Sequence, residues 1–239
     1  MIYLYNLIIY KPLLNVLVFF YNTIAFHDLG IAIILLTLLI RIILYPIFQK
    51  SARYQKISQN IQPKIAALKE KHKDDTKKQS EEMMALYKEH GINPFSGFAF
   101  LLIQIPLLIA LYHISLRIFT PEAFQNLYGF IHAPEVLNNL FLGLINLQIP
   151  NMLIIILAAA AQYVQARMSL PKSVPGQEPT QAEKIGKMMA LFSPILYVVI
   201  LLKLPSAVGL YWLTMSVLGI VQQLIINRQL GNGELGRIQ

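Results

Sequence analysis

The sequence predicts an all-α integral membrane protein with five transmembrane helices, an N-terminal interfacial helix and a cytosolic helical hairpin. Of the 239 residues, 56% are hydrophobic and only 13% are charged, whereas soluble globular chains carry about 25% charged residues. The apolar residues gather in runs of about 20, the length of helix that crosses the hydrocarbon core of a bilayer. Every Asp and Glu lies outside the interiors of these runs. A lipid environment accounts for all three observations.

The first segment, 1–26, is predicted to lie along the membrane interface. It is rich in aromatic residues and carries Asn6, Asn15 and Asn22 among them. Pro12 stands near its middle, where proline breaks or kinks a helix. This mixture suits the headgroup region better than the hydrocarbon core. The alternative is a sixth transmembrane helix. The segment has no small-residue cleavage site, so a cleaved signal peptide is not expected.

The first span is predicted at 27–50, followed by a polar and charged segment at 51–93. We expect this segment to form an amphipathic hairpin of two helices, with Pro63 kinking the first. Apolar residues recur at helical spacing on both predicted helices. They are Ile57, Ile61, Ile65 and Leu68 on the first, and Met83, Leu86 and Tyr87 on the second.

Four further spans follow the hairpin, separated by short polar or Pro-containing segments. We predict spans at 94–118, 149–168, 185–203 and 207–227, an extracytoplasmic loop at 119–148, a cytosolic linker at 169–184 and a cytosolic tail at 228–239.

The distribution of basic residues predicts the orientation of the chain. Sixteen Lys and Arg residues fall in or beside the hairpin, the linker and the tail, against three on the opposite side. Cytosolic loops of membrane proteins carry the excess of Lys and Arg. The hairpin and the C-terminus are therefore expected in the cytosol, and with five spans the N-terminus is expected outside.

Arg41 is the residue that we expect to take part most directly in the function of the protein. It lies about 18 Å from the outer end of its predicted span and about 13 Å from Lys50, at a rise of about 1.5 Å per residue. An arginine at such a depth costs about 2.5–3.5 kcal/mol on insertion scales. Since no predicted span interior contains a carboxylate, we expect Arg41 to face a hydrated cavity. The alternative is an arginine bonded to backbone carbonyls of a neighbouring helix.

Other polar residues in the spans are consistent with one hydrophilic groove around Arg41. Thr37 lies four residues before Arg41 and shares its helix face. A single polar residue in a span is otherwise a common helix–helix hydrogen bond, and Tyr and Trp near a span end can be interface anchors. The remaining predicted groove residues are Gln104, Gln162, Gln165, Tyr211, Trp212 and Ser216.

No catalytic chemistry is predicted. The chain has no cysteine, and its five histidines show no metal-ligand spacing. HExxH, G-x-S-x-G and Gly-rich phosphate-loop motifs are absent from the sequence. We therefore expect neither an enzyme, nor a metal site, nor a cofactor, nor a direct nucleic-acid substrate.

Several motifs in this order resemble the YidC/Oxa/Alb insertase family, over about residues 13–227. The stretch 33–41 followed by Tyr45-Pro46 is similar to the first core helix of the family with its groove arginine. Similar motifs continue along the chain: Ile61-Gln62-Pro63-Lys64-Ile65, 82–88, Gly91-Ile92-Asn93-Pro94, Gln104-Ile105-Pro106, Leu210-Tyr211-Trp212 and Gln222-Gln223.

The sequence departs from the family pattern in three places. Pro205-Ser206-Ala207-Val208 stands where members often have Pro-Ala-Gly-Leu, a cysteine frequent in the second core helix is absent, and the tail is short and hardly basic. No large extracytoplasmic domain of the Gram-negative type is present in the chain.

The resemblance implies an insertase of the bacterial inner (cytoplasmic) membrane that works without nucleotide hydrolysis. Its groove is expected to open to the cytosol and to lipid and to be closed on the outer side. The implied partners are nascent membrane proteins and the lipid bilayer, with the ribosome, the signal recognition machinery and a Sec translocon as further candidates. The alternatives are a small transporter or channel with Arg41 as an anion site, and a scaffold that recruits partners through the hairpin.

Overall fold

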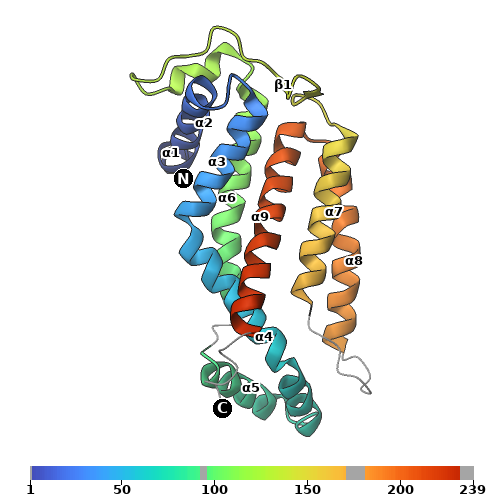
Figure 1. The fold of residues 1–239 in the computed structure, drawn as a ribbon. Helices are drawn as coiled ribbons and strands as arrows, with labels where there is room; N and C mark the ends of the chain where they lie inside the picture. Colours follow the sequence, from blue (N-terminus) through green and yellow to red (C-terminus); the bar gives the residue numbers. More distant parts are fainter. Residues whose placement is uncertain (1, 92–95, 171–180, 232–239) are drawn as a thin grey trace.

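The computed structural model describes residues 2–91, 96–170 and 181–231, and it confirms the predicted all-α integral membrane fold. Five helices run side by side, with a helical hairpin at one end of the bundle and an N-terminal helix and a loop at the other (Figure 1). The five are α3 (Leu29–Ile43), α6 (Ser96–Arg117), α7 (Met152–Ser169), α8 (Gln181–Leu201) and α9 (Ser206–Gly231).

Four of the described helices are long and apolar enough to cross a membrane by themselves. A fifth span results if α3 and the following helix α4 (Tyr45–Lys71) count as one bent pair. The apolar helix Leu102–Arg117, within α6, is shorter than a full span. The four single candidates are Tyr3–Thr23, Met152–Ser169, Lys184–Leu201 and Ser206–Gln229.

The predicted span 27–50 contains a sharp bend. Helix α3 ends at Ile43, and α4 departs from it at an angle of 72°. Pro46 lies in the first turn of α4. Because proline has no N–H to donate and its ring clashes with the carbonyl four residues earlier, a helix cannot continue straight through it at no cost. Arg41 therefore lies in the last turn of α3.

Helix α9 is the centre of the bundle. It contacts α3, α4, α6, α7 and α8, and half of its spanning segment is buried in the protein, against 11% for α8. Helix α8 packs mainly on α7, so most of its apolar side chains face outward. In a bilayer such a surface meets lipid tails, and burial in protein is not required.

The N-terminal segment forms a nearly continuous helix: α1 (Ile2–Tyr5), the π-helical turn η1 (Asn6–Tyr10) and α2 (Lys11–Thr23). Pro12 does not break it. It follows directly on the π-helical turn, in which the Lys11 N–H bonds to the Asn6 carbonyl five residues earlier, and this wider turn is where the helix accommodates the proline.

The loop between α6 and α7 caps the same end of the bundle. It contains a 3-10 helix, η2 (Pro121–Asn126), and a small antiparallel hairpin of β1 (Leu140–Phe141) and β2 (Ile145–Asn146). Residues of α2 and the start of α3 hold this loop. The buried Asn15 accepts from the Tyr128 backbone N–H at 2.6 Å and donates to the Asn126 carbonyl at 3.0 Å.

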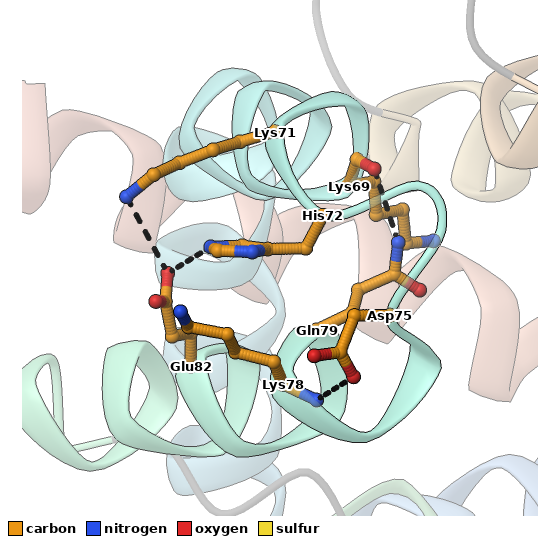
Figure 2. A network of polar contacts seen from close by, with 7 residues as sticks. All are labelled: Lys69, Lys71, His72, Asp75, Lys78, Gln79 and Glu82. Carbon is orange, nitrogen blue, oxygen red and sulfur yellow. Dashed lines mark hydrogen bonds and ion pairs between the residues drawn. The ribbon is translucent and has the colours of Figure 1, made fainter.

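The charged segment forms a hairpin of α4 and α5 (Thr76–Glu89), with Asp75 capping α5 through the Lys78 backbone N–H. Figure 2 shows the polar contacts at its tip: Glu82 lies 2.9 Å from Nε2 of His72, and Gln79 donates to the Lys69 carbonyl at 3.1 Å. Below the tip is an apolar cluster centred on the buried Ile61 and Ile65, with Tyr54, Ile57, Met83, Leu86 and Tyr87 around it. Helix α4 continues through Pro63.

We expect this apolar cluster to determine the stability of the hairpin. Ile65 is 4% exposed, so Ile65→Ala is expected to cost the hairpin about 2–4 kcal/mol. Amide hydrogen exchange in α5 should accelerate, while exchange in α7 and α9 should stay unchanged, because neither contributes to the cluster. Leu68→Ala is the control: it makes a similar truncation on the same helix, outside the cluster. Equal acceleration in the spans would show that the hairpin is not an independent unit.

Candidate functional site around helix α9

Arg41 contacts α9 through a side-chain amide. Its Nη2 donates to Oε1 of Gln222 at 2.6 Å, and its guanidinium carbon lies 4.1 Å from the centre of the Phe48 ring. Gln222 in turn donates through Nε2 to Oε1 of Gln49 at 3.0 Å. The acceptor of this bond is therefore a neutral side-chain amide, neither a carboxylate nor a backbone carbonyl of a neighbouring helix. Phe48 offers the guanidinium a π face, as in other cation–π pairs.

The partner on α9 indicates how deep this site lies. Gln222 is 16 residues after the start of α9 at Ser206 and six residues before Arg228. At a rise of about 1.5 Å per residue, these separations are about 24 Å and about 9 Å along the axis. The guanidinium is thus closer to the end of α9 that bears Arg228, and it is only partly buried.

Gln104 of α6 and Tyr211 of α9 form a second polar contact, about three helical turns along α9 from Gln222. Gln104 donates through Nε2 to the Tyr211 hydroxyl at 2.7 Å, and Tyr211 is fully buried. The other end of the same amide, Oε1 of Gln104, is buried and has no hydrogen-bond partner among the described residues. Because buried carbonyl oxygens are ordinarily satisfied, this atom is a place where a water or a substrate donor fits.

Thr37 lies on the Arg41 face of α3 and is 1% exposed. Its hydroxyl donates to the carbonyl of Ile33, one turn earlier, at 2.6 Å. A threonine that bonds within its own helix in this way has no donor left for a partner. Thr37 thus shares a helix face with Arg41, and its hydroxyl hydrogen is already used within α3.

The other predicted residues lie on the opposite side of α9, toward α7 and α8. Ser216 and Gln162 approach at 3.5 Å, and Trp212 packs on Tyr197 of α8 with ring centres 4.5 Å apart. The Gln165 amide lies directly against Gly219, where any side chain would collide with it. Close approach over a glycine is typical of helix pairs in membranes. The predicted residues thus make two sets of contacts, one toward α3 and α6 and the other toward α7 and α8.

Gln222 and Gln49 were not among the groove residues predicted from the sequence. Gln222 follows Tyr211 by 11 residues, three helical turns, and so shares its side of α9. That spacing was available in the sequence. Gln49 carried no such signal, because it stands beside Lys50 at the edge of an apolar run. Only the bend between α3 and α4 brings it toward α9.

Comparison with known proteins identifies relatives of this chain. Residues 19–232 match the family model described as 60Kd inner membrane protein. The chain is also similar to curated proteins named membrane protein insertase YidC. The one from Geobacter sulfurreducens (strain ATCC 51573 / DSM 12127 / PCA) is 33% identical over 224 residues, and the one from Syntrophus aciditrophicus (strain SB) is 35% identical over 218 residues.

These alignments cover most of this chain and a smaller part of each relative. They include 94% and 91% of the chain, but 38% of the Geobacter protein and 36% of the Syntrophus protein. The chain therefore spans less than two fifths of the length of these two relatives.

Proposed function

The chain belongs to the 60Kd inner membrane protein (YidC/Oxa/Alb) family and is a multi-pass inner-membrane protein, and on that premise we propose that it is a membrane protein insertase. It is not an enzyme in this proposal and uses no nucleotide. It receives a substrate segment in a hydrophilic groove and releases the segment into the bilayer. The observation that carries the proposal is the Arg41 guanidinium, held within the spans by a neutral amide.

The groove is proposed on the side of α9 that carries Tyr211 and Gln222. A guanidinium has five N–H donors in a fixed fork, and Gln222 occupies one nitrogen. The buried Oε1 of Gln104 adds an acceptor that no described residue bonds. Polar groups of this kind are costly in hydrocarbon unless water or a polar ligand reaches them. Water in a groove would satisfy both the guanidinium and the Gln104 oxygen. Gln162, Gln165 and Ser216, which lie toward α7, extend this groove or pack the two helices together.

The driving force comes from the substrate and the membrane. Arg41 attracts an acidic or polar segment that must cross to the outer side, because an opposite charge lowers the cost of taking a carboxylate out of water. The apolar helix of the substrate then moves into lipid, where its burial is favourable. For acidic segments the membrane potential adds about 2.3 kcal/mol per charge per 100 mV.

We propose that the hairpin end of the bundle faces the cytosol and the capped end faces outward. The charge asymmetry described above supports this orientation, with the N-terminus outside and the C-terminus inside. The hairpin is then positioned to receive a nascent chain. The ribosome, the signal recognition machinery and a Sec translocon are the candidate partners at that surface.

We also propose that the N-terminal helix lies across the outer end of the bundle and does not span the membrane. It packs against α3 and the end of α6, and it bonds to the loop that caps this end of the bundle. Near its start, the Tyr5 hydroxyl is 3.1 Å from His113, one turn before the end of α6. Near its other end, Tyr21 and Asn22 bond the backbone of the 119–148 loop. A helix crossing beside α3 would leave this level within two or three turns.

The proposal is tested by reconstituting the purified chain in liposomes with a single-span substrate. Insertion is measured as the substrate fragment protected from an added protease. Insertion well above protein-free liposomes is expected, without nucleotide. Ion flux in liposomes that lack substrate, with no gain in protected fragment, would instead identify a channel or transporter. Unaltered insertion on Arg41→Ala, with loss on hairpin deletion, would point to a scaffold.

A further inference from the structure

The orientation of the Gln222 amide is fixed by its two partners. Oε1 accepts from Arg41 at 2.6 Å and Nε2 donates to Oε1 of Gln49 at 3.0 Å. Turning the amide over would place an NH₂ group against the guanidinium and an oxygen against the oxygen of Gln49. Both contacts would be repulsive, because the guanidinium has only donors. Arg41 and Gln49 together favour the orientation that places the oxygen of Gln222 toward Arg41.

The bond between Arg41 and this oxygen is of intermediate strength. Gln222 is 6% exposed, so the bond is shielded from water. Its acceptor is a neutral amide, whereas a carboxylate forms shorter, frequently bidentate bonds with a guanidinium, roughly twice as strong as neutral pairs. A carboxylate that reaches this position would therefore displace the amide. An apolar residue in place of Gln222 would leave the guanidinium without this acceptor.

We propose that Gln222 is a placeholder for the substrate: its amide oxygen occupies the carboxylate-binding position of Arg41 in the resting protein, and an acidic group of the incoming segment replaces it. This inference rests on the proposed function, since it assumes that Arg41 binds the translocated segment. In the resting state the Gln222 oxygen accepts a hydrogen bond from the Arg41 guanidinium. During insertion it yields to a carboxylate at little cost, and it returns when the substrate leaves. Gln222 is thereby a specificity-determining residue for acidic segments.

The placeholder is tested with Gln222→Glu, which puts a permanent carboxylate on Arg41. Insertion is measured for one single-span substrate with an acidic tail and for the same substrate with a neutral tail. The internal ion pair should compete with the acidic tail and lower its insertion by about tenfold, while the neutral tail should change by no more than about twofold. The readout is the ratio of insertion of the acidic-tailed substrate to insertion of the neutral-tailed substrate. General damage to the fold would lower both values and leave this ratio unchanged.

Gln223→Glu is the matched control. Gln223 is adjacent, equally buried at 5% exposed, and bonds to Asn227 at 3.3 Å without contacting Arg41. Its added charge should leave the ratio at the wild-type value. An equal fall of the ratio in both variants would show plain repulsion of acidic tails and overturn the placeholder.

A second variant guards against misfolding of Gln222→Glu. Gln222→Met keeps the length of the side chain and removes the oxygen, so acidic tails no longer compete with it. The ratio should then be at or above the wild-type value, and a fall would overturn the placeholder. If wild-type protein inserts neither substrate above the level of protein-free liposomes, the proposed function itself fails, and this outcome is distinct from a failure of the placeholder alone.

Discussion

Replacing Arg41 with glutamine is expected to reduce insertion of acidic-tailed substrates by about tenfold or more, and replacing it with lysine should retain most activity. Two unit charges about 4 Å apart attract by about 4 kcal/mol at an effective dielectric constant of 20, and a factor of ten needs only about 1.4 kcal/mol. Glutamine keeps hydrogen bonding to Gln222 but removes the charge. Lysine keeps the charge, and its ammonium also suits the Phe48 ring.

The experiment compares wild type, Arg41→Lys and Arg41→Gln on the acidic-tailed and neutral-tailed forms of one substrate. If charge is the cause, the glutamine variant fails chiefly on the acidic tail. Lysine loses the planar fork of five donors, so a deficit of both variants on both tails would indicate that geometry or hydration matters, and the charge-attraction account would be wrong.

The helices of this protein could be predicted from the sequence because lipid selects apolar runs of a defined length. The predicted spans at 149–168 and 207–227 correspond to α7 and α9, which begin at Met152 and Ser206. The break between α3 and α4 was harder to foresee. Pro46 was visible, but a proline near the end of an apolar run is compatible with a kinked span as well as with a 72° turn.

The candidate site was predictable only in part. Arg41 stood out because a cation in a span interior is expensive. Its partner Gln222 is 181 residues away in the chain, and nothing in local periodicity pairs the two. The same holds for the loop between α6 and α7, whose contacts with Asn15 and Tyr21 join residues more than 100 positions apart. In the sequence that loop was merely a moderately apolar connection.

Docking of this loop predicts a second large effect, at Gly30. A Cβ on Gly30 would lie 2.9 Å from Cβ of Phe141 and closer still to its ring, so the strand β1 must move away. Within a helix, alanine is more favourable than glycine by about 1 kcal/mol. Any destabilisation by Gly30→Ala must therefore come from the lost docking of Phe141. The neighbouring bond from the Leu142 N–H to Asp28, 2.6 Å, should be lost with it.

The consequence is expected at the end of α9 that lies beneath this loop. Ala207 is 2% exposed, and its backbone N–H donates to the Leu147 carbonyl at 3.1 Å. The chain has no cysteine, so Ala207→Cys introduces a single probe. Its reaction with a membrane-impermeant thiol reagent, added from outside, should accelerate about tenfold in the Gly30→Ala background as the loop opens.

Gly129→Ala provides the control, because a Cβ on Gly129 meets no atom within 4 Å, and it should leave the thiol reaction at its starting rate. Phe141→Ala combined with Gly30→Ala separates steric conflict from the mere loss of an aromatic contact. With the ring removed, Gly30→Ala should add nothing further to the reaction rate, because the two substitutions act on one contact. An equal increase from Gly30→Ala with and without Phe141 would mean that the glycine matters for some other reason. Closure of this end of the bundle would then depend on contacts other than the packing of Phe141 on α3.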